Sequence, residues 1–246
     1  MKQHIFTTAG HSAALNIAVD KLKKDNTFLP SPQKECTVLL LPVPSLQPDG
    51  TIVGGGDLSA ILEQLPKNIT VIGGNLRHPK LTPYKTIDLL QDPIYLAKNA
   101  AITAYCAVAD ALTHLPVIIH KCPILILGWG RIGKCLAQLL CQMGAFVTVA
   151  ARKETDRACA TSLGYNAIKF SEIKPKDYRL IYNTIPYPVL YDSSAVPKIE
   201  LASTPGMEGE NIIDARGLPS KRAPESSGLL IAETITRLLK ERDDSL

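Results

Sequence analysis

The 246-residue chain lacks several features that would assign it to a specialised class of protein. Its six cysteines follow neither C-x-x-C nor zinc-finger spacing, and most stand in apolar runs, as expected of small buried side chains in a reducing cytosol. The first residues, MKQHIFTTAGH, contain neither the apolar core nor the cleavage site of a signal peptide. The longest stretch of low charge, residues 99–119, carries Asp110, His114 and Pro116, which argues against a membrane span. We therefore expect a cytoplasmic protein without an anchor.

The charge is also modest and dispersed. Lys plus Arg number 27 and Asp plus Glu 23, a formal net charge of +4, and the cations form no basic stripe. This argues against a nucleic-acid-binding protein, although it would help to attract a small anion into a cleft. Hydrophobic residues make up 46% and charged residues 20%, the balance of an ordinary globular protein.

In the first part of the chain, short apolar runs alternate with amphipathic segments. The runs at residues 4–7, 37–41 and 69–72 predict strands. One helix is expected around residues 15–22 and another from Asp57 to about Leu65, with a turn at Pro48-Asp49-Gly50 between them. This βαβαβ order is typical of a parallel sheet covered by helices. We expect residues 1–95 to form a small flavodoxin-like α/β domain on the substrate side.

A second alternation begins after a helix expected over residues 96–115. Residues 96–120 would connect two domains, and residues 121–222 would form a Rossmann-type, doubly wound parallel sheet, with a cleft between the domains. A closing helix at about 224–242, within a segment 223–246, would pack back toward the first domain. The expected strands of the second domain are residues 124–127, 146–150, 167–170, 180–183, 199–202 and 212–214.

The most informative motif is the glycine-rich turn Gly128-Trp129-Gly130-Arg131-Ile132-Gly133. It matches G-x-G-x-x-G, follows an apolar strand and opens an amphipathic helix inside a βαβ unit, which is the context of a dinucleotide-binding fingerprint. Gly128 would permit the tight turn, Gly130 would let the backbone approach a pyrophosphate, and Gly133 would allow close packing of helix on strand. The alternative is a glycine-rich turn that binds no nucleotide.

The end of the next strand bears on the choice of coenzyme. A site for NAD places Asp or Glu about 20 residues after the glycines, where it binds the ribose hydroxyls. Here the corresponding residues are Ala150-Ala151-Arg152-Lys153, with no carboxylate before Glu154. Two cations at this position favour the 2′-phosphate of NADP. The alternatives are that NAD is used or that both cations are solvated loop residues.

Three later loops follow expected strands and should border the same crevice, because ligands bind at the carboxyl ends of parallel strands. They would contribute Asn183, Thr184 and Pro186 from one loop, Ser203 from the second, and Gly217, Leu218 and Pro219 from the third. Each loop can also be explained by ordinary turn chemistry.

A family resemblance becomes visible at this point. The order GWGRIG, ARK, NTIP, ELASTPG and GLPSKRAPESSG resembles the second half of the dipicolinate synthase A-subunit family, from about Asn99 to the C-terminal helix. It is also similar, more broadly, to the NAD(P) domains of D-2-hydroxyacid dehydrogenases. In the first part of the chain the resemblance rests on Leu41-Pro-Val-Pro44 followed by Asp49-Gly50.

The resemblance implies an NAD(P)-dependent oxidoreductase subunit that oxidises dihydrodipicolinate, or its hydrated precursor, to dipicolinate during sporulation. It also implies a flavoprotein-like partner, the B subunit of dipicolinate synthase. The sequence departs from the family at Ile102–Cys106, where a Pro-Thr-x-Glu-Gly pattern is usual, and at Ser203-Thr204-Pro205, where an arginine is expected. A nucleotide-binding, non-catalytic subunit of the same complex therefore remains an alternative, and a homodimer remains open.

A small dicarboxylate substrate would need cations or N–H groups for its carboxylates and a base for the proton released with the hydride. In the first domain, Asn75, Arg77 and His78 follow the third strand, and His11 follows the first. We expect His11 and His78 to serve acid–base chemistry and Asn75 and Arg77 to bind substrate. Asn99 and Thr103, one turn apart on the connecting helix, are further candidates for substrate binding. Solvated loop or helix-surface positions are the alternative for each.

Overall fold

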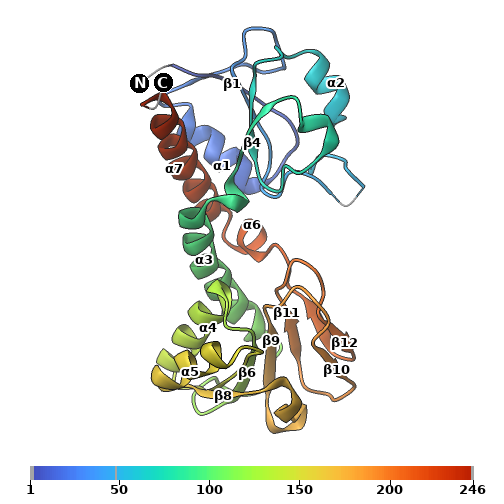
Figure 1. Cartoon of the computed structure of the whole chain (residues 1–246), viewed down its shortest axis with the longest axis vertical. Coiled ribbons are helices and arrows are strands. Elements are labelled where there is room, and N and C mark those ends of the chain that lie inside the picture. Colours follow the sequence, from blue (N-terminus) through green and yellow to red (C-terminus); the bar gives the residue numbers. More distant parts are fainter. Residues whose placement is uncertain (1–2, 48, 245–246) are drawn as a thin grey trace. The chain divides into compact units, whose positions relative to one another are not determined.

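The computed structural model describes residues 3–47 and 49–244 and divides into two compact units (Figure 1). Unit 1 comprises Met1–Asn99 and Ala223–Leu246, and unit 2 comprises Ala100–Arg222. The chain passes between the units twice, first inside helix α3 (Pro93–Ala111) and again between Arg222 and Ala223. Within the described ranges, no helix combines the length and the apolar character needed to cross a bilayer.

Unit 1 contains a parallel sheet of five strands in the order β2-β1-β3-β4-β5. This 2-1-3-4-5 order is that of flavodoxin-like folds. The register is continuous across the sheet: Thr7 pairs with Leu39, which pairs with Val71, which pairs with Thr86. The strands are β1 (Ile5–Thr8), β2 (Thr27–Phe28), β3 (Val38–Leu40), β4 (Thr70–Gly73) and β5 (Lys85–Asp88).

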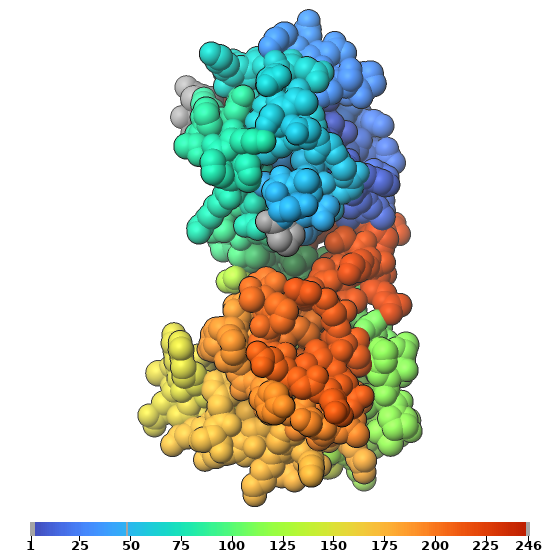
Figure 2. Space-filling model, turned by 90° about the vertical axis from the view of Figure 1, so that its right-hand side faces the viewer, coloured from blue at the N-terminus to red at the C-terminus, as the bar shows by residue number. Residues whose placement is uncertain are grey.

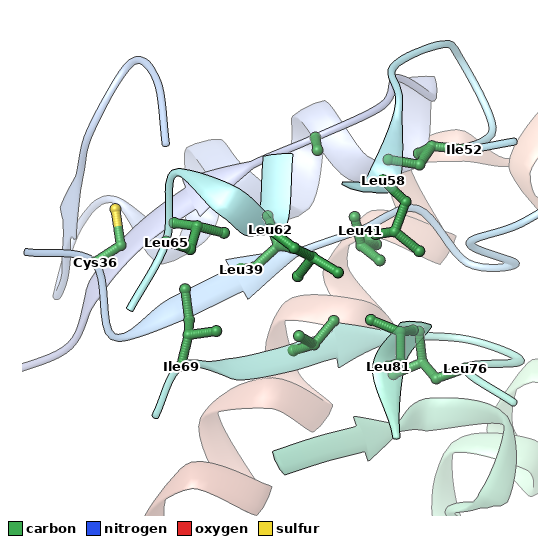
Figure 3. Close-up of a cluster of buried hydrophobic side chains, with 12 residues drawn as sticks. Cys36, Leu39, Leu41, Ile52, Leu58, Leu62, Leu65, Ile69, Leu76 and Leu81 are labelled. Carbon is green, nitrogen blue, oxygen red and sulfur yellow. The ribbon is translucent and has the colours of Figure 1, made fainter. Parts of the chain in front are cut away.

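Local hydrogen bonds set where the short helices of unit 1 begin. The Ser12 hydroxyl accepts from the Leu15 N–H before α1 (Ala13–Leu22), and the Asp57 carboxylate accepts from the Ala60 N–H before α2 (Leu58–Glu63). Leucines of α2 pack with alternate side chains of β3 and β4 to form the apolar cluster in Figure 3. The 3₁₀ turns η1 (Pro79–Leu81) and η2 (Leu89–Gln91) complete the connections.

The long helix α7 (Pro224–Asp243) belongs to unit 1 and packs against α1. The two helices approach closely at Gly228, because a Cβ at that position would stand 2.6 Å from the carbonyl oxygen of Ala14 and 2.7 Å from Cβ of Ile17. A partly buried ion pair between Arg237 and Asp92, 2.7 Å long, joins α7 to the start of α3. The short distances from position 228 to α1 leave room for glycine but not for a larger residue.

Unit 2 contains a parallel six-stranded sheet in the order β13-β11-β9-β6-β7-β8. From β8 inward this is the 3-2-1-4-5-6 order of a dinucleotide-binding Rossmann fold. The direction of strand order reverses between β6 and β9, which pair directly. The strands are β6 (Pro123–Leu127), β7 (Phe146–Ala150), β8 (Asn166–Ile168), β9 (Leu180–Asn183), β11 (Lys198–Glu200) and β13 (Ile212–Asp214).

Helices α4 (Arg131–Gln142) and α5 (Glu154–Ser162) form the crossovers from β6 to β7 and from β7 to β8 (Figure 1). The turns η3 (Phe170–Glu172) and η4 (Pro175–Asp177) lie between β8 and β9, and α6 (Leu218–Arg222) ends the unit. A separate parallel pair, β10 (Leu190–Asp192) and β12 (Met207–Gly209), lies beside the main sheet. Figure 2 shows this part of the chain in orange.

The structure confirms the α/β class with a flavodoxin-like sheet and a Rossmann-type sheet, and it corrects several details. The helix expected over 96–115 begins at Pro93 and ends at Ala111. The strand expected over 167–170 ends at Ile168, because Phe170 begins a 3₁₀ turn. Pro48 of the expected 48–50 turn lies outside the described residues.

The contact at Gly228 gives a test of the α1–α7 packing. Gly228→Ala should lower the free energy of unfolding by about 1–3 kcal/mol, because the new Cβ overlaps backbone and side-chain atoms of α1. Helix propensity alone predicts the opposite, a gain of about 1 kcal/mol. Urea unfolding measures the difference, with the exposed Ser226→Ala on the same helix as the control. A stabilised Gly228→Ala variant would show that the helices do not pack this closely.

Candidate coenzyme site

The glycine-rich turn lies where the strand order reverses in unit 2. Gly128 follows β6 with a φ of +102°, and a Cβ there would stand 2.7 Å from the Thr184 hydroxyl and 2.8 Å from Ile185. Thr184 holds the end of the neighbouring strand against the turn, since its hydroxyl donates to the Leu127 carbonyl at 2.8 Å. Both the backbone conformation and the close approach therefore require glycine at position 128.

The next two glycines differ in what surrounds them. A Cβ at Gly133 would collide with the carbonyl oxygen of Gly128, so this residue lets α4 approach the strand. Apart from its chain neighbours and the backbone of its own helix, a Cβ at Gly130 would meet no atom of the described residues within 4 Å. Gly130 is the N-cap of α4, no side chain caps the helix, and its first turn contains no acidic residue. The free N–H groups and the positive end of the helix dipole thus face open space suited to a phosphate.

A pocket of about 260 Å³ opens at this turn. It is lined by Gly128–Gly130 and Ala151–Lys153, by Thr184–Tyr187, and by Asp156 and Phe170. Arg152 lies over the ring of Tyr187, with its guanidinium carbon 5.7 Å from the ring centroid. Arg157 supports this loop, because it donates to the carbonyls of Ala151 and Arg152, both at 2.8 Å. The pocket therefore combines the open turn with two cations and an aromatic wall.

Trp129 reaches the pocket from the turn but packs mainly inward. Its side chain is 6% exposed and meets the ring of Tyr165 edge-on at a centroid distance of 5.6 Å. The Lys134 ammonium lies 5.8 Å from the centre of the indole. The remaining residues predicted from the motif, Arg131 and Ile132, form the first turn of α4 and do not line the pocket.

Asn183 and Glu200 build the base of the neighbouring loops. The Asn183 carboxamide donates to both carboxylate oxygens of Glu200, at 2.8 and 3.1 Å, and accepts from the Ile185 N–H. Glu200, only 2% exposed, also accepts from the backbone N–H groups of Ala202, Gly206 and Met207. These contacts give Asn183 a structural role, and they fix the loops that follow β9 and β11.

Sequence reasoning missed Glu200, because a charged residue in a short strand is normally exposed. The sequence feature that could have identified Glu200 is its position at the end of an apolar segment, directly before the loop that it organises. The other predicted loop residues do not line the 260 Å³ pocket: Ser203 is exposed, Gly217 precedes α6 with a φ of +70°, and Leu218 and Pro219 lie on α6. Pro186 and Thr184 do line it.

In unit 1, the predicted residues follow the carboxyl ends of two strands. The backbone N–H of His11 donates to the Val53 carbonyl, and its side chain is exposed. Asn75 adopts a φ of 59°, and the N–H groups of Asn75 and Leu76 both donate to the Asp88 carboxylate at 2.9 Å. His78 Nδ1 accepts from the Lys80 N–H at 3.3 Å. Arg77 between them is exposed.

Two predicted residues lie on α3. Thr103 is 6% exposed and Asn99 is partly exposed, one helical turn apart. Asn99 is the last residue of the first segment of unit 1, whereas Thr103 belongs to unit 2. Each of them already interacts with other residues of the chain.

Comparison with known proteins supports this interpretation of the fold. No family model matches the chain. It is 31% identical to the A subunit of dipicolinate synthase from Bacillus subtilis over 173 residues, which cover 64% of this chain and 58% of that protein. Over this stretch the chain is similar to the dipicolinate synthase A subunit. The match thus spans less than two thirds of the relative's length.

Solved structures resemble the whole chain. The A subunit of dipicolinate synthase from Bacillus halodurans superposes with a TM-score of 0.85 at 21% identity, covering 97% of this chain and 98% of that one. The Bacillus subtilis A chain gives 0.82 at 20% identity, covering 100% and 99%. A transhydrogenase of Sinorhizobium meliloti gives 0.73 at 14% identity, covering 97% and 94%. These likenesses show the fold alone, a Rossmann-like α/β fold.

The contrast between two glycines gives a test of the turn. Gly130→Ala should cost no more than about 1 kcal/mol of stability, since its Cβ meets no atom from another part of the described chain, but it should weaken dinucleotide binding at least about tenfold by occupying the phosphate position. Gly133→Ala should instead lose about 1–3 kcal/mol of stability through overlap with the Gly128 carbonyl. Urea unfolding and calorimetric titration with NADPH separate the two effects. Equal dinucleotide affinity in wild type and Gly130→Ala would contradict the assignment.

Glu200 gives a second prediction. Glu200→Gln should destabilise unit 2 by about 2–4 kcal/mol, because one acceptor oxygen becomes an NH₂ group facing buried N–H donors. The exposed Glu208→Gln is the matched control, and urea unfolding is the measurement. If both variants unfold alike, the buried network does not hold these loops.

Proposed function

We propose that this protein is an NADP-dependent oxidoreductase subunit of the dipicolinate synthase type, which oxidises dihydrodipicolinate or its hydrated precursor to dipicolinate. The observation that carries the proposal is the open space at Gly130, at the uncapped start of α4 and beside Arg152 and Lys153. The name of the Bacillus subtilis relative supplies the substrate class. The dehydrogenase-like fold supports redox chemistry on a nicotinamide dinucleotide.

The residues of the pocket fit such a coenzyme. The α4 N-terminus would hold the pyrophosphate, and the Thr184–Tyr187 segment would wall the crevice. The end of β7 carries no carboxylate for a ribose diol, whereas Arg152 and Lys153 offer two charges to a 2′-phosphate. We therefore favour NADP over NAD. When bound, the coenzyme would accept a hydride.

The chain's own residues would bind the dicarboxylate and take the proton that leaves with the hydride. His78 Nδ1 accepts a hydrogen bond from the Lys80 N–H, so a neutral His78 carries its proton on Nε2 and is suited to donate to a carboxylate. The exposed imidazole of His11 is the better candidate for proton acceptor. Arg77, Asn75, Asn99 and Thr103 are our candidates for binding the substrate carboxylates.

A second, flavoprotein-like B subunit of dipicolinate synthase would complete the enzyme, since the relatives are named as the A subunit or A chain of theirs. The test is incubation of the purified chain, with and without this B subunit, with dihydrodipicolinate and NADP. Absorbance at 340 nm that rises only with substrate and is lost in His11→Ala supports the proposal. Coenzyme binding without turnover, even with the partner present, would instead identify a non-catalytic nucleotide-binding subunit.

Coenzyme choice can be tested separately. Arg152→Asp should raise the dissociation constant for NADP by a factor of roughly ten to a hundred, about 1.5–3 kcal/mol for one charged contact, and change that for NAD far less. Lys174→Asp, an exposed position of the same unit, is the charge-matched control. Calorimetric titration with each coenzyme is the measurement. Equal loss of affinity for both coenzymes would remove the argument for NADP.

A further inference from the structure

A second and larger pocket, of about 930 Å³, lies at the other edge of the sheet of unit 2. Its walls come from residues 114–117 and 192–197 and from Lys176, Tyr178 and Arg179. Residues 176–179 lead directly into β9 and residues 192–197 directly into β11, so the pocket lies at the amino ends of these strands. The glycine-rich turn follows the carboxyl end of β6. The two pockets are therefore separate sites on opposite edges of a parallel sheet.

The wall formed by residues 192–197 is held by a buried lysine. Lys198 is fully buried, and its ammonium donates to the carbonyls of Ser194, Val196 and Glu210, each at 3.0 Å. It also lies 2.9 Å from the Asp192 carboxylate. A buried ammonium is stable only when its donors are satisfied, so these contacts fix the loop around it. The pocket wall is thereby preformed, as is usual for ligand sites.

The charges that face the pocket are unbalanced. Asp192, the one carboxylate among its lining residues, is already paired with Lys198 and accepts from the Ser194 hydroxyl. Burial works to raise the pKa of Asp192, but the Ser194 and Lys198 hydrogen bonds outweigh it and hold that pKa below its usual value. Lys176 and Arg179, in contrast, make no ion pair with any residue in the described ranges. Two cations are therefore available to a ligand.

The rest of the lining is mostly apolar. The apolar lining consists of Leu115, Pro116, Val117, Ala195, Val196 and Pro197, with the half-buried Tyr178. His114, Ser193 and Ser194 add polar groups. A volume of 930 Å³ is within the range of about 300–1,000 Å³ found for small-molecule sites. An apolar lining with a few cations suits a ligand that has an apolar body and a negative group.

We propose that this pocket is a second ligand site, which binds an organic anion with an apolar or aromatic body. Arg179 and Lys176 would contact the anionic group, the apolar walls would contact the body, and the Lys198–Asp192 pair would keep the wall in place without competing for the anion. The proposal does not depend on the function proposed for the coenzyme site.

The experiment uses the full chain, titrated both without NADPH and in its presence, so that any anion bound at the glycine-rich turn is recognised by its loss on addition of NADPH. The probes are 2-naphthoate, benzene-1,3-dicarboxylate and inorganic phosphate, titrated by calorimetry, and the binding region is mapped by hydrogen exchange. We expect one site for 2-naphthoate or the dicarboxylate, slower exchange in peptides covering 113–119 and 190–197, and at least about tenfold weaker binding of phosphate, which lacks an apolar body.

Variants locate the contact. Arg179→Glu and Lys176→Glu should each weaken binding at least about tenfold, the loss expected for one charge-assisted hydrogen bond. Lys67→Glu, an exposed lysine of unit 1, carries the same change of charge and should have no effect. The milder Arg179→Ala serves if charge reversal impairs folding. Absence of binding, binding unaffected by these variants, or protection confined to residues 128–133 and 151–153 would overturn the proposal. None of these outcomes decides whether the coenzyme site is functional.

Discussion

The architecture of unit 2 depends on close contacts between backbone segments at the turn that connects β6 to α4. Gly128 leaves room for Thr184 and Ile185 of the neighbouring loop, and Gly133 brings the helix against the Gly128 carbonyl. Any side chain at these two positions would push the helix away from the sheet. The close packing aims the free N–H groups of the first helical turn at the open space beside Gly130, where a Cβ would meet no atom from another part of the described chain.

The loops near this turn are stabilised mainly by buried hydrogen-bonded polar groups. Glu200 collects hydrogen bonds from Asn183 and from three backbone N–H groups, and so joins the loops after β9 and β11. Lys198, two residues earlier in the same strand, does the same at the opposite edge of the sheet. One three-residue strand thus organises the loops at both of its ends. The cost of burying each charge is offset because each has several partners.

The sequence predicted the parts of this structure that follow from spacing. The glycine motif, the alternation of strands and helices and the two parallel sheets could all be inferred, because periodicity and turn residues report local conformation. The strands β2, β5, β10 and β12 could not, because they bury few side chains and so lack the apolar runs of the inner strands. The buried roles of Lys198 and Glu200 escaped prediction because their partners are mostly backbone groups brought near by the fold.

The central claim is that the space beside Gly130 holds a dinucleotide. The chain contains one tryptophan, Trp129, which lies inside the turn, so its fluorescence reports on this pocket. Titration of the full chain with NADPH should quench this fluorescence in a saturable way that fits one site. NADP should compete with NADPH for that site. Unchanged tryptophan emission and no heat of binding at millimolar coenzyme would contradict the account.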